Sequence, residues 1–290
     1  MNFLAVLLAL AAERLVPHGL GFGQPVLLRA ILRALDKVRL GALLARSAVL
    51  PWLLTALAVA AAAFLQSLLP GLFLQGVFGG LVLFFCLGPR DLTDDVQALL
   101  AARAAGDLPE VARLARRLQH GPEPEASHRS LLGALFIQSH ERLFGVLLWF
   151  VAMGPAGAVF YRVASRLPAQ VEALEPHTAA ASAAAQLHGL AAWLPVRFCA
   201  ALFALAGSMD DALAAWRRVG ELEYQHGWRS HSWAVLAEVA SCALATEEAD
   251  GKQAPPPNLE SALREVLRMQ TRALLILLAG FAVFTTGTLM

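Results

Sequence analysis

Apolar residues occur in long uninterrupted runs along the chain, separated by more polar segments. Two of the runs, 47–69 and 71–88, contain no charged residue, and the Leu-Pro-Gly turn between them predicts a helical hairpin. A helix needs roughly 20 apolar residues to cross the hydrocarbon of a bilayer, or about 17 at the short end. The runs therefore predict membrane spans over residues 2–16, 47–69, 71–88, 143–163, 190–206 and 272–289.

The polar segments have the periodicity of helices rather than that of strands. Residues 89–142 contain two amphipathic stretches broken at Gly106–Asp107, and residues 208–271 contain further helical stretches with a polar, Pro-rich linker over 247–258. The helix expected after this linker runs on into the last span. The sequence therefore predicts an all-α fold: a polytopic helical membrane bundle, a single membrane domain over 1–290, with helical cytoplasmic loops.

The composition agrees with a membrane protein and excludes other classes. Hydrophobic residues make up 58% of the chain and charged residues 16%, whereas soluble domains have about 45–50% and about 25%. The net charge of +1 provides no basic field, so we expect no nucleic-acid partner. The three cysteines are far apart, and "SHER", residues 139–142, does not match a zinc-binding helix motif. We therefore expect neither a metal nor a cofactor.

Lysine and arginine are distributed unevenly among the segments between the spans. If the N-terminus lies outside, 19 of the 23 fall in the three segments 17–46, 89–142 and 208–272, which then all lie on the inner side. Cytoplasmic loops are enriched in these residues, so we predict a periplasmic N-terminus. The first run lacks the basic start of a signal peptide, and we expect it to be retained as a span.

Arg197 is the strongest candidate for a functional residue, because it lies in the middle of the span 190–206. A charge near the centre of a span costs about 3 kcal/mol on insertion scales and usually pairs with another group. Pro195 frees backbone carbonyls that a guanidinium could engage. Two interpretations stay open. Arg197 is a structural residue that pairs with Glu13 or reaches the interface, or it binds a phosphate or carboxylate, which its planar fork suits.

Three polar residues near the cytoplasmic end of the first span form a second candidate group. Glu13 and Arg14 close the span, and His18 follows about one turn later. Arginine is an ordinary anchor on the inner side of a membrane, whereas a glutamate is not. We therefore expect Glu13, Arg14, His18 and Arg197 to form one ligand-binding pocket that faces the cytoplasm.

The span 143–163 contains the stretch "MGPAGA", which predicts a helix contact. Its glycine and alanine four residues apart allow helices to approach closely, and Pro155 predicts a kink. Tyr161 and Arg162 end this span on the side opposite to the basic segments. There we expect them to belong to an interfacial belt.

Three stretches of the chain together resemble the AmpE family. They are the "ER" that closes the first span, "RLFGVLLWFVAMGPAGAVFYRVASRL", and "WLPVRFCAALFALAGSMDDALAAW". AmpE proteins are described as inner-membrane regulatory signalling modulators linked to β-lactamase induction. They are distant relatives of the CobD/CbiB synthases, which attach an amino-alcohol phosphate to the corrin ring. The family motifs are matched at Glu13, Arg14, Gly154, Pro155, Gly157, Tyr161, Arg162, Trp193, Pro195 and Arg197.

The chain lacks two motifs of the synthases, and these differences determine the function that we expect. Synthases carry a His-Pro motif after the first span and an Asn- and Asp-bearing segment before the fourth, where this chain reads "VPHGLGFGQP" and "SHERLF". The resemblance therefore implies a modulator of the cell-wall-damage and β-lactam response in the bacterial inner membrane. It would bind an anionic ligand or a cytoplasmic protein partner, without a catalytic residue. Whether the protein is an enzyme stays open. The alternative is a CobD/CbiB-type membrane transferase acting on a corrinoid and an amino-alcohol phosphate.

Overall fold

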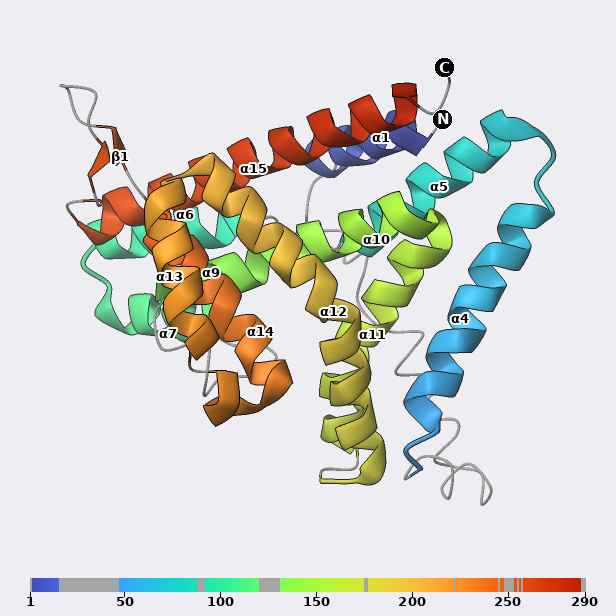
Figure 1. Ribbon diagram of the computed structural model, residues 1–290, viewed down its shortest axis with the longest axis horizontal. Coiled ribbons are helices and arrows are strands. Elements are labelled where there is room, and N and C mark those ends of the chain that lie inside the picture. The colour runs from blue at the N-terminus through green and yellow to red at the C-terminus, as the bar shows by residue number, and fades with distance from the viewer. Residues whose placement is uncertain are drawn as a thin grey trace. The chain divides into compact units, whose positions relative to one another are not determined.

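The fold is almost entirely helical, as the sequence predicted. The structure, a computed structural model, describes residues 2–15, 47–87, 92–119, 131–174, 177–221, 223–244, 246–247, 253–254, 256 and 258–287 (Figure 1). Its helices are α1 (Asn2–Leu15), α4 (Leu50–Ser67), α5 (Gly71–Leu87), α6 (Leu92–Ala104), α7 (Leu108–Leu118), α9 (Leu131–Ser139), the π-helical turn η2 (His140–Phe144), α10 (Gly145–Met153), α11 (Pro155–Leu174), α12 (Ala179–Ala206), α13 (Met209–Glu221), α14 (Glu223–Cys242) and α15 (Leu259–Gly287). Within the described residues, β structure is limited to β1 (Thr246–Glu247) and β2 (Gln253–Ala254), a short antiparallel pair at the predicted linker.

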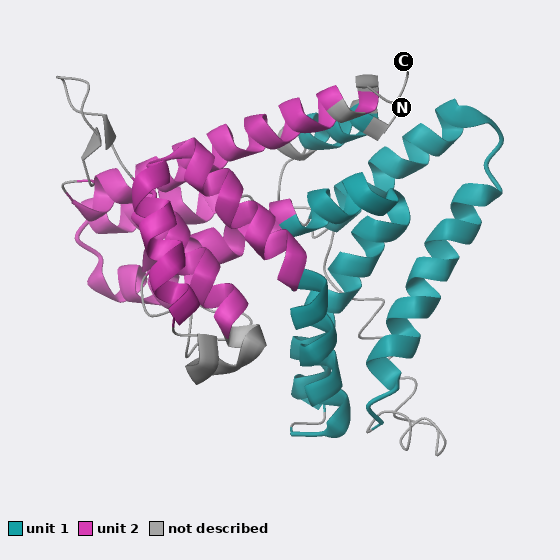
Figure 2. Cartoon of the chain, in the orientation of Figure 1, with its two compact units in different colours: residues 1–89, 145–192 teal, residues 90–144, 193–290 magenta. Residues whose placement is uncertain are grey.

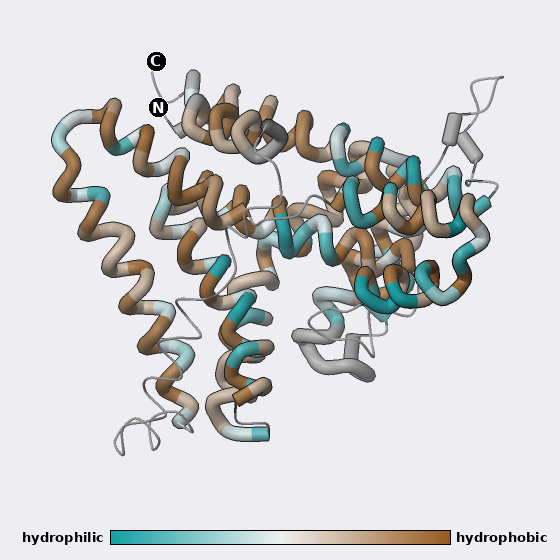
Figure 3. The backbone as a smooth tube through the Cα atoms, turned by 180° about the vertical axis from the view of Figure 1, so that it is seen from behind, coloured by the Kyte–Doolittle hydropathy of each residue, from teal (hydrophilic) through white to brown (hydrophobic). Residues whose placement is uncertain are grey.

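Five helical segments of the described chain are long and apolar enough to cross a membrane. They fall within the ranges Leu50–Ser67, Gly71–Ala104, Leu131–Met153, Ala179–Ala206 and Leu259–Val283, and residues 88–91 of the second range lie outside the described residues. The first, second and last are mainly exposed, with 22%, 24% and 22% of the apolar stretch buried, whereas 61% is buried in each of the other two. Apolar positions predominate along α4 (Figure 3). These helices fit a lipid bilayer, and the protein is a multi-pass membrane protein.

The described helices gather into two compact units (Figure 2). Unit 1 consists of residues 1–89 and 145–192, and unit 2 consists of residues 90–144 and 193–290. Because one boundary falls within α12, this helix contributes residues to both units. The expectation of one membrane domain over 1–290 stays a prediction.

In unit 1, the predicted span 143–163 is not one helix, because the chain reverses at Gly154. This residue has a left-handed backbone with a φ of 64°, and Pro155 begins α11 directly after it. Glycine adopts this conformation at no steric cost, and proline suits the first turn of a helix. The hairpin packs tightly from there: a Cβ at Gly157 would overlap the carbonyl oxygen of Trp149 on α10. The sequence predicted only a kink at this position.

The reversal changes the expected positions of Tyr161 and Arg162. The Tyr161 ring is fully buried and lies against Gly145 at the start of α10, where a Cβ would overlap it. Nε of Arg162 donates a hydrogen bond to the carbonyl of Cys86 in the last turn of α5. The predicted interfacial belt was therefore wrong. α11 returns both residues towards the end of α5, where the Arg162 cation offsets the partial negative charge of the last carbonyls.

In unit 2, α6 and α7 form the amphipathic hairpin that the sequence predicted. The break falls at Gly106, which has a φ of 72°. The Asp107 carboxylate caps α7 by accepting a hydrogen bond of 3.1 Å from the backbone N–H of Glu110. Leu114 and Leu118 are buried on the inner face of α7, which packs against α9.

Aromatic rings form the centre of unit 2. Phe203 of α12 contacts Phe136 of α9 and Phe144 of η2 edge to face, with ring centroids 4.8 and 5.4 Å apart. All three rings are fully buried, and α14 packs along α9. Such edge-to-face pairs stabilise a core beyond the area that they bury. This core holds η2 in place between α9, α12 and α14.

The exposed face of α15 changes its character along the helix. Arg264, Arg268 and Arg272 follow one another at intervals of four residues and are exposed, and further along the helix Leu275 and Val283 are exposed. Residues at this spacing share one face of a helix. One continuous stripe of α15 is therefore basic at its start and apolar at its end. As the sequence predicted, α15 is a single long helix.

Candidate functional site

Arg197 of α12 lies in unit 2, and its side chain is held by α12 and α14. Its Nη1 donates hydrogen bonds to the carbonyl oxygen of Trp193, 3.0 Å away, and to Oγ of Ser232 on α14, 3.3 Å away. The guanidinium carbon lies 4.1 Å from the centroid of the Trp193 ring, a cation–π contact. The side chain is half-buried. The guanidinium is therefore oriented at the edge of an apolar core.

Pro195 frees a carbonyl in α12, and Trp149 donates a hydrogen bond to it. The freed group is the carbonyl of Ala191, which would bond to a backbone N–H four residues later, where proline has none. Its oxygen accepts a hydrogen bond of 2.8 Å from the indole Nε1 of Trp149 on α10. The sequence suggested that a guanidinium could engage carbonyls near Pro195; an indole N–H binds the carbonyl of Ala191, and Arg197 binds that of Trp193.

The other three residues of the predicted pocket lie outside the side chains that the structure describes. Glu13 and Arg14 belong to the last turn of α1, but only their backbone is described. His18 lies in the segment between the described ranges 2–15 and 47–87. Their shared pocket with Arg197 therefore stays a prediction.

The turn η2 brings buried polar residues towards the α14 segment that binds Arg197. π-helical turns are rare and occur frequently at functional sites. His140 in this turn is fully buried, and its ring contacts Trp233 edge to face with centroids 5.8 Å apart. Trp233 directly follows Ser232, which accepts the hydrogen bond from Arg197. Ser139, just before the turn, is also buried, and its hydroxyl has no hydrogen-bond partner among the described residues.

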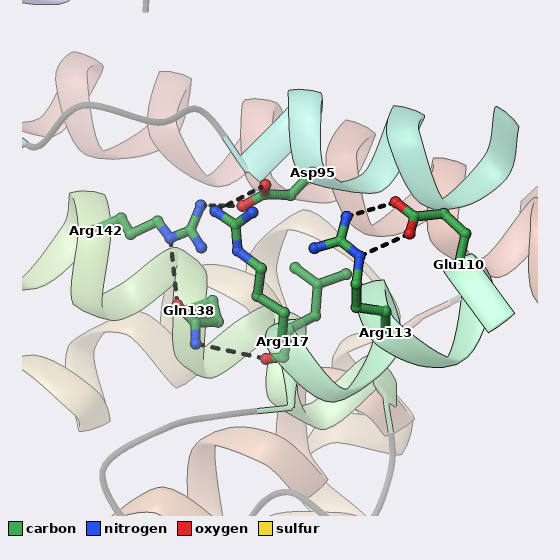
Figure 4. Close-up of polar contacts among 7 residues, drawn as sticks. Asp95, Glu110, Arg113, Arg117, Gln138 and Arg142 are labelled. Carbon is green, nitrogen blue, oxygen red and sulfur yellow. Dashed lines mark hydrogen bonds and ion pairs between the residues drawn. The ribbon is translucent and has the colours of Figure 1, made fainter. Parts of the chain in front are cut away.

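The same turn contributes Arg142 to an ion-pair cluster with α6 and α7 (Figure 4). Nη1 of Arg142 lies 2.8 Å from Oδ2 of Asp95, and Nη2 of Arg117 lies 3.7 Å from Oδ1 of the same carboxylate. Gln138 accepts a hydrogen bond of 3.2 Å from Nε of Arg142 and donates one of 3.5 Å to the carbonyl of Leu118. The Asp95 side chain is only 7% exposed. One buried carboxylate therefore holds two guanidinium groups at the surface of unit 2.

A separate ion pair lies nearer the start of α7. Nε and Nη2 of Arg113 donate hydrogen bonds to the two carboxylate oxygens of Glu110. These hydrogen bonds hold the pKa of Glu110 below its usual range. Exposed pairs three residues apart on a helix contribute little to stability, and we assign this pair no functional role.

Sequence reasoning missed His140 and the Asp95 cluster. Asp95 and Arg142 are 47 residues apart, so only tertiary packing reveals their contact. One signal was available, because "SHER" places four polar side chains at the start of an apolar segment where charges are costly. Among the described residues, no three His, Cys, Asp or Glu side chains form a group that could hold a metal ion.

The fold defines a polytopic helical membrane protein, and its described part contains arginines that neighbouring side chains hold in place. A family model described as CobD/Cbib protein matches residues 6–267. This match covers most of the chain, and the protein belongs to the CobD/CbiB family.

Two curated relatives share part of the sequence. The cobalamin biosynthesis protein CobD of Stutzerimonas stutzeri is 30% identical over 172 residues, which cover 57% of this chain and 56% of the relative. The cobalamin biosynthesis protein CobD of Chromobacterium violaceum is 28% identical over 145 residues, which cover 47% of this chain and 45% of the relative. The matches thus span about half the length of these relatives. No solved structure matches the chain.

These comparisons overturn the expected identity and function. The resemblance to AmpE was wrong as a family assignment, and so was the regulatory role in β-lactamase induction and antibiotic response. The family match runs through the segments whose departures suggested a non-catalytic relative, and the relatives are named for cobalamin biosynthesis. The findings support the alternative that the sequence had left open.

Proposed function

We propose that this protein is a membrane-embedded synthase of cobalamin biosynthesis that joins a corrinoid acid to an amino-alcohol phosphate. The observation that carries the proposal is the CobD/CbiB family match over residues 6–267. The reaction would form an amide from an amine and a carboxylic acid and release water. Because this condensation is unfavourable in water, cleavage of ATP would have to drive it.

The oriented arginines support binding of anionic substrates. A phosphate matches the planar fork of a guanidinium, which can donate two parallel hydrogen bonds to it. Trp193 and Ser232 fix the orientation of Arg197 before a substrate arrives, which lowers the entropy cost of binding. We propose Arg197 as the residue that binds the substrate anion, together with Glu13, Arg14 and His18 in the cytoplasm-facing pocket.

Genetic complementation tests this function. A bacterial strain without its own CobD/CbiB protein, on a medium where growth needs cobalamin, should grow when it produces this chain. The Arg197→Ala variant, at the same abundance in the membrane, should restore growth poorly. If the cells still fail to grow although their membranes contain the intact protein, this result would contradict the proposed synthase.

We propose further that the protein lies in the bacterial inner membrane with a periplasmic N-terminus. The distribution of lysine and arginine supports this orientation, since three segments hold 19 of the 23, and the long apolar helix Leu131–Met153 takes the place of the predicted span 143–163. The basic start of the exposed α15 stripe would then lie on the cytoplasmic side. Its apolar end would run through the bilayer towards the periplasm.

Reporter fusions at the C-terminus should therefore respond as periplasmic fusions. Alkaline phosphatase joined after Met290 should be active and green fluorescent protein should be dark, because only the phosphatase matures outside the cytoplasm. The same reporters inserted at Gly106, in the turn between α6 and α7, provide the control and should behave in the opposite way. A fluorescent C-terminal fusion would contradict the proposed orientation.

A further inference from the structure

Two arginines of α15 lie where the exposed stripe of this helix changes from charged to apolar. The Arg268 side chain is 70% exposed and that of Arg272 is 50% exposed, whereas Leu275, within one further turn, is 60% exposed. On a membrane helix an exposed leucine faces lipid, and arginine heads turn to the interface. The surface of the hydrocarbon therefore lies between Arg272 and Leu275.

The spacing along α15 gives each arginine a depth. An α-helix rises about 1.5 Å per residue, so Arg268 lies about 6 Å and Arg264 about 12 Å beyond Arg272 along the axis. The headgroup layer of one leaflet is roughly 5–7.5 Å thick. Arg268 and Arg272 therefore lie within the layer that contains the lipid phosphates, and Arg264 lies beyond it.

A buried carboxylate holds both of these guanidinium groups in place. Glu265 is 3% exposed, and its oxygens lie 2.7 Å from Nη2 of Arg272 and 3.5 Å from Nη1 of Arg268. Arg272 also donates from Nη1 to the carbonyl of Ala206, 3.1 Å away. Two cations share one anion, so the three side chains carry a net charge of +1 at the lipid surface.

We propose that Arg268 and Arg272 form a binding site for the headgroup of an anionic phospholipid. Their depth places them among lipid phosphates, and their net charge favours a lipid that is itself negative. Glu265 keeps the two guanidinium groups side by side, which suits the several oxygens of one phosphate. A soluble anion would have to compete with phosphates already present at this depth.

Lipid binding to the purified full chain tests the site. The protein in detergent is mixed with equal amounts of phosphatidylglycerol and phosphatidylethanolamine, and bound lipids are counted by native mass spectrometry. The wild type should retain phosphatidylglycerol preferentially. Arg268→Gln should reduce this preference about fivefold, which corresponds to about 1 kcal/mol for one arginine near the surface.

Arg264→Gln is the matched control. Arg264 lies on the same stripe with 62% of its side chain exposed, and it pairs with Glu260 four residues earlier. Its loss should change the preference by less than about twofold, because it lies outside the headgroup layer. An equal loss in both variants would indicate a diffuse charge effect and overturn the site, as would an unchanged preference in Arg268→Gln. Displacement of the lipid by millimolar inorganic phosphate would also overturn it, in favour of a soluble anion.

Discussion

Gly157→Ala is expected to destabilise the protein by about 3 kcal/mol, a cost at the upper end of those for overpacking. The added Cβ would overlap the backbone carbonyl of Trp149 and lie 2.9 Å from Cβ of Met153. A backbone carbonyl within a helix cannot rotate away as a long side chain can, so α10 and α11 would have to separate. The melting temperature in detergent, followed by tryptophan fluorescence, should fall by several degrees.

Gly220→Ala provides the control for this substitution. Gly220 also lies within a helix, α13, but a Cβ there would meet no atom within 4 Å. Alanine is favoured over glycine inside a helix by about 1 kcal/mol, so this variant should be unchanged or slightly more stable. If the two variants melted alike, the close α10–α11 contact would be refuted.

If the protein is the proposed synthase, Arg197→Ala is expected to lower the catalytic efficiency for the phosphorylated substrate about 100-fold. A hydrogen bond to a charged group contributes roughly 1.5–3 kcal/mol, and about 2.7 kcal/mol, within this range, corresponds to a factor of 100. Arg197→Lys keeps the charge but loses the planar fork, so it should lose about tenfold. The measurement is kcat/KM with varied amino-alcohol phosphate, and most of the change should appear in KM.

Ser232→Ala separates a binding role of Arg197 from a structural one. Ser232 accepts a single hydrogen bond of 3.3 Å from the guanidinium, so its removal should loosen the orientation of Arg197 and cost only a few fold. A melting temperature that fell in Arg197→Ala without a change in KM would leave Arg197 as a structural residue, which was the other interpretation of the sequence.

Local sequence signals predicted the parts of the fold that depend on local chemistry. Gly106 and Asp107 ended one helix and capped the next, and the periodic charges before the last span continued into α15. The reversal at Gly154 was missed because hydropathy is the same whether an apolar segment continues or folds back on itself. The Gly154–Pro155 pair is present in the sequence, but only the contact between Gly157 and Trp149 in the structure shows that the chain forms a hairpin there.

The candidate site could be predicted only in part, for the same reason. Arg197 was found because a charge in an apolar span is conspicuous in any sequence. Its partner Ser232 lies 35 residues away and Asp95 lies 47 residues from Arg142, so no local pattern joins them. Three short motifs were likewise not enough to assign the family, because related families can share such segments. The family model, by contrast, matches residues 6–267.

Turnover by the purified protein is the most direct test of the proposed synthase. The full chain in lipid nanodiscs is incubated with ATP, a corrinoid acid and an amino-alcohol phosphate. The corrinoids are then separated, and their masses are measured by mass spectrometry. The synthase predicts a new corrinoid heavier by the amino-alcohol phosphate less one water, formed only when ATP is present and much less with Arg197→Ala. Unchanged corrinoid acid after incubation with a protein that retains its melting transition would contradict it.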